Sequence, residues 1–152
     1  LFDLSSGTVF FRLKLWQGAW NMALDHPWLG VGPDNFLYEY RTRYVLPAAW
    51  EELNLSHPHN VVLDALTRLG LAGLAAMILF LASLCGRLVA GARRARPEER
   101  RALFTGLLGG MAAFLAHGLI DNSFFLVDLA LVCIMTAGIA ARWASRPETE
   151  NE

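Results

Sequence analysis

Three long runs of apolar residues occupy the second half of the chain, and each is long enough to form a membrane-spanning helix. They cover about residues 62–90, 102–120 and 124–142. The first run has no charged residue from Leu69 to Gly86. A helix needs roughly 20 consecutive apolar residues to cross the hydrocarbon core of a bilayer. The pattern therefore predicts an all-α fold: an integral membrane helical bundle with three crossings, followed by a short polar tail.

The first half of the chain is more polar, and one segment of it has the spacing of an amphipathic helix. Arg12, Trp16 and Trp20 recur every four residues, which places them on one helical face. The helix is expected over about residues 8–25 and ends at His26, because the residue before a proline disfavours the α conformation. Further predicted segments are a second short helix from Phe36 to Tyr44 and an irregular loop from Pro47 to Pro58.

The arginines at the ends of the apolar runs set the expected orientation. They gather on one side of the predicted bundle: Arg93, Arg94, Arg96, Arg100 and Arg101 between the first two runs, and Arg142 and Arg146 after the third. Lys and Arg are enriched in cytoplasmic loops. The C-terminal tail is therefore expected in the cytoplasm, residues 1–58 outside it, and residues 59–152 in the transmembrane part. His117 and Asp128, polar residues inside the runs, are expected to lie close together.

Composition narrows the class of protein further. Hydrophobic residues make up 55% of the 152 positions, which is high for a soluble protein. The net charge of −1 provides no basic field, so nucleic acid is not an expected partner. The chain opens without methionine, in what reads as a loop, and we therefore expect a fragment of a longer membrane protein.

The segment Ser56-His57-Pro58-His59-Asn60 places two imidazoles and an amide at the start of the first apolar run. An imidazole titrates near neutral pH and can accept a proton from a hydroxyl group. Two simpler interpretations remain open at this point. In the first, the histidines only cap a helix at the membrane interface; in the second, the His-x-His pair is half of a zinc site. No cysteine and no carboxylate pair nearby in the sequence completes such a site, so we expect no metal.

Several blocks of sequence resemble the O-antigen ligases and the related O-antigen polymerases. The first is His59-Asn60, followed after nine residues by Gly70-Leu71-Ala72-Gly73. Upstream, residues 26–36 resemble the family pattern HPxxGxGxxxF, and Arg12 with Trp16 resemble the arginine and tryptophan that precede it. The resemblance extends from about Phe11 to Leu74 and keeps the order of the blocks.

This resemblance implies a GT-C-like glycosyltransferase in the bacterial inner membrane. Such an enzyme moves a glycan from an undecaprenyl-diphosphate carrier to a hydroxyl of a lipid A core, a glycan or a protein, with no cofactor. The resemblance does not separate ligase from polymerase. The alternative is a membrane transporter or a ligand-binding membrane protein without turnover. As a fragment without its supporting helices, the chain is expected to be inactive alone.

The resemblance also assigns expected roles to residues. Arg12 would bind the diphosphate, since a guanidinium can donate two parallel hydrogen bonds to the oxygens of a phosphate group. His59 would act as the general base. His57 and Asn60 are expected to contact substrate. Arg41 and Arg43 would supply a second diphosphate contact, unless they are solvated loop charges. Four glycines are expected to be structural: Gly30 and Gly32 as turn formers, and Gly70 and Gly73 as sites of close helix packing.

Overall fold

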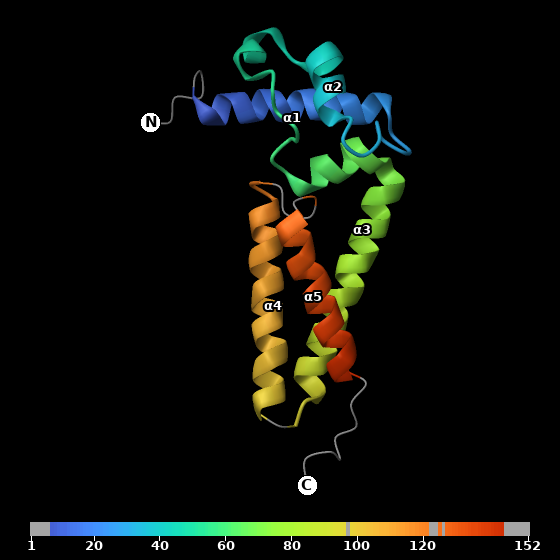
Figure 1. Cartoon of the computed structure of the whole chain (residues 1–152), viewed down its shortest axis with the longest axis vertical. Helices are drawn as coiled ribbons and strands as arrows, with labels where there is room; N and C mark the ends of the chain where they lie inside the picture. The colour runs from blue at the N-terminus through green and yellow to red at the C-terminus, as the bar shows by residue number, and fades with distance from the viewer. Residues whose placement is uncertain (1–6, 97, 122–124, 126, 145–152) are drawn as a thin grey trace. The chain divides into compact units, whose positions relative to one another are not determined.

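The computed structural model describes residues 7–96, 98–121, 125 and 127–144, and all regular structure in these residues is helical (Figure 1). The order along the chain is α1 (Thr8–Asp25), α2 (Phe36–Glu39), η1 (Tyr40–Tyr44), η2 (Pro47–Glu52), α3 (Val61–Arg94), α4 (Glu98–Gly118) and α5 (Val127–Ala144). The all-α prediction is confirmed for this part of the chain. The predicted irregular loop from Pro47 is wrong over η2, because Pro47 at the first position presets a helical φ.

The chain forms two compact units. Unit 1 comprises Leu1–Met77 with Gly118–Asn122, and unit 2 comprises Ile78–His117 with Ser123–Glu152. The boundary between them falls inside α3, so residues 61–77 of that helix belong to the same unit as the N-terminal half. The division predicted from the sequence, residues 1–58 outside the cytoplasm and 59–152 in the membrane, concerns the bilayer and stays a prediction.

The core of unit 1 forms between α1 and the short helices that follow it. Leu15, Ala19 and Met22 lie on one face of α1 and pack with Phe36 and Tyr40, all of them buried. The rings of Phe36 and Tyr40 are stacked, with centroids 5.7 Å apart. Burying one such side chain contributes about 1.5–3 kcal/mol. This core fixes α1, and with it the neighbouring face that carries Arg12 and Trp16.

A glycine interrupts α3 close to its start. Gly70 has φ 66° and ψ −166°, a backbone conformation that residues other than glycine rarely adopt. An interruption leaves backbone groups without their helical partners, and the loop at residues 27–32 supplies partners here. The bonds run from Val31 N to Thr67 O (2.8 Å), Gly32 N to Arg68 O (3.0 Å), Leu71 N to Pro27 O (2.8 Å) and Ala72 N to Trp28 O (3.3 Å). We call residues 27–32 with 67–72 the Gly70 junction.

The glycines of the Gly70 junction allow two main chains to touch. A Cβ atom on Gly70 would overlap the main chain of Trp28, and one on Gly30 would overlap that of Thr67. Gly30 and Gly32 both have positive φ, at 66° and 96°. Gly70 therefore meets a loop backbone, whereas the sequence suggested contact with another helix. Two sequence blocks of the family resemblance, 26–36 and 70–73, form one backbone-to-backbone contact.

Replacing Gly70 by alanine is expected to destabilise unit 1. The new Cβ adds a backbone clash to a conformation that by itself costs about 1–3 kcal/mol for other residues. Thermal unfolding of the purified full-length protein in detergent measures the effect. Gly109→Ala is the matched control, because nothing lies within 4 Å of a Cβ there and alanine favours a helix by up to about 1 kcal/mol. Equal melting temperatures for the two variants would contradict the role of the junction.

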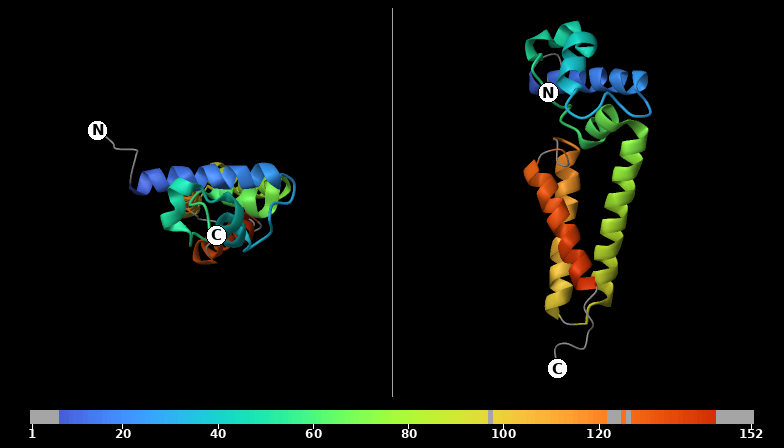
Figure 2. Two further views of the ribbon diagram at one scale, coloured as in Figure 1. Left: turned by 90° about the horizontal axis from the view of Figure 1, so that it is seen from above. Right: turned by 45° about the vertical axis from the view of Figure 1, so that its right-hand side comes forward.

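Unit 2 contains the remainder of α3 with α4 and α5, which run side by side (Figures 1 and 2). Large apolar side chains point outward, among them Leu79 at 70% exposure and Ile134 at 62%. Such surfaces are costly in water and ordinary in lipid. Among the described residues, α3 is long and apolar enough to cross a membrane, and α5 includes the shorter apolar segment Ala130–Arg142. A bundle with three crossings stays a prediction. The expected proximity of His117 and Asp128 stays a prediction, because the side chain of Asp128 lies outside the part of the chain that the structure describes.

Candidate functional site

The segment from His57 to Asn60 is held at several points before α3 begins. The indole Nε1 of Trp16 donates a 2.8 Å hydrogen bond to the carbonyl oxygen of Pro58, which is buried. Oδ1 of Asn60 accepts hydrogen bonds of 3.0 Å from the backbone N–H groups of Val62 and Leu63. This is the side-chain cap that satisfies the free donors at a helix N-terminus. Pro58 and Asn60, on either side of His59, are thus held in place.

His59 has an unusual backbone between these fixed points. Its φ of 50° lies in the left-handed region, which non-glycine residues seldom occupy but histidine tolerates better than most. Such conformations persist only where the surrounding contacts enforce them, and they occur often at active sites. The strained backbone directs the His59 side chain toward the turn that follows α4, which belongs to the same unit.

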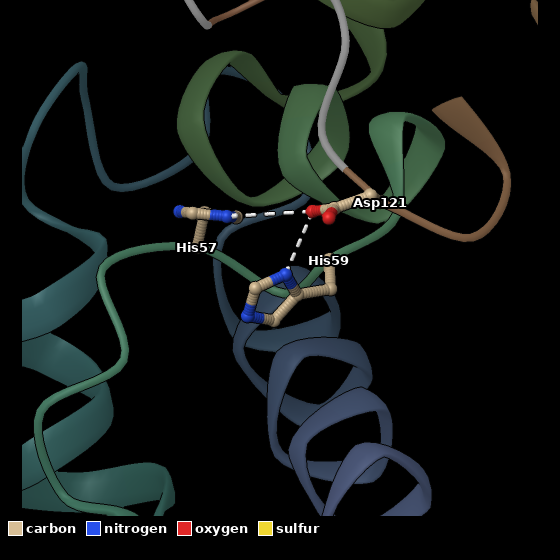
Figure 3. Close-up of side chains that lie close together, drawn as sticks. All are labelled: His57, His59 and Asp121. Carbon is tan, nitrogen blue, oxygen red and sulfur yellow. Dashed lines mark hydrogen bonds and ion pairs between the residues drawn. The ribbon is translucent and has the colours of Figure 1, made fainter. Parts of the chain in front are cut away.

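Three residues of the family blocks converge on this turn. Arg12 Nη1 donates to the carbonyl oxygen of Ile120 at 2.8 Å, and Asn60 Nδ2 donates to that of Leu119 at 3.0 Å. His59 Nδ1 lies 2.8 Å from Asp121 Oδ1 (Figure 3). The guanidinium and the imidazole expected to act together are therefore bonded to adjacent residues of one turn. The sequence alone gave no sign that this turn takes part in a site.

The bond to Asp121 determines which nitrogen of His59 can act as a base. An ionised carboxylate has only acceptor atoms, so Nδ1 of the neutral imidazole carries the hydrogen. The lone pair then resides on Nε2, which faces away from Asp121. A carboxylate in this position also stabilises the imidazolium formed when Nε2 takes a proton. The pair is suited to general-base chemistry.

His57 joins the same group of side chains. Its Nε2 lies 3.8 Å from Asp121 Oδ1, and its ring centroid lies 4.4 Å from that of His59 (Figure 3). Ser56 Oγ is 3.0 Å from Nδ1 of His57. Burial lowers the pKa of His57, and His59 lowers it further, while Asp121 acts in the opposite direction. We call His57, His59 and Asp121 the His–His–Asp cluster.

Arg68 is a buried arginine that sequence analysis did not single out. Its Nε donates to Asp64 Oδ1 at 2.7 Å, its Nη1 to Asp34 Oδ1 at 3.1 Å, and its Nη2 to the carbonyl oxygen of Ser56 at 3.0 Å. It thereby ties α3 to the loop after Gly32 and to the residue before His57. Asp64 and Arg68, four residues apart just before the uncharged run, were the available signal.

The remaining arginines of the sequence prediction lie elsewhere on unit 1. Arg41 and Arg43 are exposed on η1, and Arg43 forms a 3.6 Å ion pair with Glu39. Within the described residues, neither of them contacts His59. A diphosphate contact from Arg41 or Arg43 stays a prediction, and the solvated-charge interpretation agrees with their exposure.

Comparison with known proteins places the chain in a family. The family profile described as O-antigen ligase matches residues 3–78, half of the chain. A search of curated proteins finds no match. The chain belongs to the O-antigen ligase family, a family of membrane proteins, as the sequence blocks predicted. Membership indicates a role in glycosyl transfer for polysaccharide biosynthesis. The matched region includes Arg12, His59 and Gly70 but ends before Asp121.

Proposed function

We propose that this chain carries part of the active site of a membrane glycosyltransferase that uses an undecaprenyl-diphosphate-linked glycan as donor. The acceptor is a hydroxyl of a lipid A core, a growing glycan or a protein. The observation that carries the proposal is the 2.8 Å contact between His59 Nδ1 and Asp121 Oδ1, beside the bond from Arg12 to Ile120. These two bonds attach a base, His59, and a permanent positive charge, Arg12, to adjacent residues of one turn. A base and a positive charge are the two groups that the transfer requires.

The reaction follows from the chemistry of these two groups. Nε2 of His59 takes the proton of the acceptor hydroxyl, whose oxygen attacks the anomeric carbon of the donor sugar. The bond from that carbon to the diphosphate oxygen breaks, and its electron pair leaves with the carrier. Arg12 stabilises the negative charge that develops there. A guanidinium has five N–H donors, and the bond to Ile120 uses one of them.

Asn60 and Asp121 position the base in this scheme. The Asn60 amide uses its oxygen to cap α3 and its nitrogen to hold Leu119, so it fixes the turn next to Asp121. We assign it a positioning role instead of the substrate contact expected from the sequence. His57 remains a proposed substrate contact. Holding the reacting groups in place through packed neighbours is what makes such a site effective.

The proposed topology puts the chemistry outside the cytoplasm of a bacterial inner membrane. Residues 1–58 lie on the outer face, three helices cross the bilayer, and the C-terminus is cytoplasmic. The arginines of residues 93–101, together with Arg142, support this orientation. The exposed apolar side chains of α3 and α5 support contact with lipid.

Replacing Arg12 tests the proposal. In the full-length protein, Arg12→Ala is expected to lower the rate of glycan transfer by about 10²–10³-fold, as loss of an electrostatic stabiliser does. Arg12→Lys is expected to retain part of the rate, because lysine keeps the charge without paired hydrogen bonds. Transfer of the labelled glycan and release of undecaprenyl diphosphate are measured in membranes with equal amounts of inserted protein.

Lys14→Ala is the matched control, since it removes a cation from the same helix. Lys14 lies over the ring of Phe10, 5.6 Å from its centroid, and has no place in the mechanism. A near-normal rate in Arg12→Ala would remove that residue from the mechanism. Donor binding without any release of undecaprenyl diphosphate by the wild-type protein would favour the transporter or ligand-binding alternative.

A further inference from the structure

The His–His–Asp cluster has the composition of a metal site. Two imidazole nitrogens and one carboxylate oxygen lie within 4.8 Å of one another. The sequence shows the histidine pair but no third ligand near it, because Asp121 is 62 residues from His59. We propose that the cluster binds a divalent cation of the zinc class, and that the bound cation inhibits the enzyme by occupying its base.

The distances in the cluster suit such an ion. Zinc binds histidine nitrogen and carboxylate oxygen at about 2.0–2.2 Å, which puts neighbouring donor atoms of a tetrahedron roughly 3.3 Å apart. Asp121 Oδ1 lies 2.8 Å from His59 Nδ1 and 3.8 Å from His57 Nε2, values on either side of this spacing (Figure 3). All three donor atoms lie within 4.8 Å of one another. Imidazole ligands favour zinc, whereas Mg²⁺ and Ca²⁺ prefer oxygen ligands.

The surroundings of the cluster resemble those of protein metal sites, in which neighbouring groups orient the ligands. A ligating histidine commonly donates its other ring N–H to a neighbour, which fixes the ring. Ser56 Oγ is such a neighbour, 3.0 Å from Nδ1 of His57, so Nε2 is directed into the cluster. Buried Pro58 separates the two histidines, and its carbonyl oxygen accepts the bond from Trp16. Three protein ligands leave a fourth position for water or a substrate oxygen.

Binding at His59 Nδ1 excludes base catalysis by the same ring. With Asp121 as its partner, the neutral ring carries its hydrogen on Nδ1 and its lone pair on Nε2. A cation on Nδ1 requires the lone pair there, so the single hydrogen of the neutral ring moves to Nε2. The outer nitrogen then donates and cannot accept a proton from the acceptor hydroxyl. This inhibitory step rests on the proposed function, whereas cation binding does not.

Calorimetric titration of the full-length, chelator-treated protein with Zn²⁺ alone tests the site. We expect one ion per chain, with affinity reduced at least 10-fold in His57→Ala and in Asp121→Ala. His26→Ala is the matched control, because it removes a histidine of unit 1 outside the cluster and should leave the affinity unchanged. Equal affinity in the wild type and both cluster variants would overturn the site.

A spectroscopic measurement on the wild type guards against variants that fail to fold. Co²⁺ bound in a four-coordinate site with histidine ligands gives strong visible absorption, which Zn²⁺ should displace. Absence of this absorption, together with absence of heat on zinc addition, would overturn the site in the unaltered protein.

The glycan-transfer assay tests the inhibition. Zn²⁺ is expected to lower the rate in proportion to occupancy of the site, Mg²⁺ at the same concentration to leave it unchanged, and a chelator to restore it. Binding without inhibition, or stimulation by zinc, would overturn the inhibitory role. A chelator-treated protein that binds zinc but never transfers glycan would instead count against the proposed function.

Discussion

Replacing His59 by alanine is expected to slow glycan transfer by about 10²–10⁴-fold, the usual contribution of a positioned general base. The structure gives the reason, because the 2.8 Å contact with Asp121 leaves Nε2 of His59 as the atom that can accept a proton. The rate is measured in the full-length protein at saturating donor, with membrane insertion checked separately. His26→Gln is the histidine control and should transfer at the normal rate.

The companion variant Asp121→Asn separates positioning of His59 from simple support of the fold. Asparagine can offer an amide N–H to Nδ1 and so favour the tautomer with the hydrogen on Nε2. We expect kcat to fall while KM for the donor changes little, and the pH dependence of kcat to change with it. A proportional rise in KM with an unchanged kcat and pH profile would show that Asp121 serves binding or stability only.

Replacing Arg68 by methionine is expected to destabilise the protein by about 3–5 kcal/mol, the cost of removing one member of a buried ion pair. The buried carboxylate that loses the charge of Arg68 is Asp64, which is 0% exposed, whereas Asp34 loses little because its side chain is 97% exposed. The free energy of unfolding is measured with denaturant on the full-length protein in detergent.

Two further variants identify the cause of that loss. Combining Arg68→Met with Asp64→Leu removes both buried charges and should recover much of the stability. Arg43→Ala breaks an ion pair with the same spacing, between a 65% exposed arginine and the half-buried Glu39, and should change stability by no more than about 1 kcal/mol. A loss in Arg68→Met as small as that in Arg43→Ala would contradict the role of Arg68.

Local sequence patterns predicted the helices well. The helix from Thr8 to Asp25 has the expected bounds, because a four-residue repeat defines its face and Pro27 ends it. The first apolar run lies within α3, and the short helix expected from Phe36 to Tyr44 is present as α2 and η1. In each case the determining interactions are within a few residues of one another.

The assembly of the candidate site could not be predicted in the same way. Arg12 bonds a residue 108 positions away and His59 one 62 positions away, and no spacing rule connects such pairs. The histidine pair therefore seemed to lack a third partner. Gly70 was assigned to helix packing, because the sequence does not reveal that another backbone fills the space beside it. The family resemblance gave Arg12 and His59 expected roles but no information on Asp121, which lies beyond the matched residues.

The Gly70 junction has a consequence for how the protein is made. Residues 27–32 leave the ribosome well before residues 67–72, yet the N–H groups of Val31 and Gly32 find their carbonyl partners only on that later segment. The N-terminal half therefore completes its structure only after the beginning of α3 has been synthesised. If α3 enters the bilayer as proposed, its insertion by the translocation machinery and the closing of the outer loop become a single coupled event. A nascent chain whose residue 67 has not yet emerged from the ribosome should remain sensitive to protease around Pro27, and one whose residue 72 has emerged should become resistant.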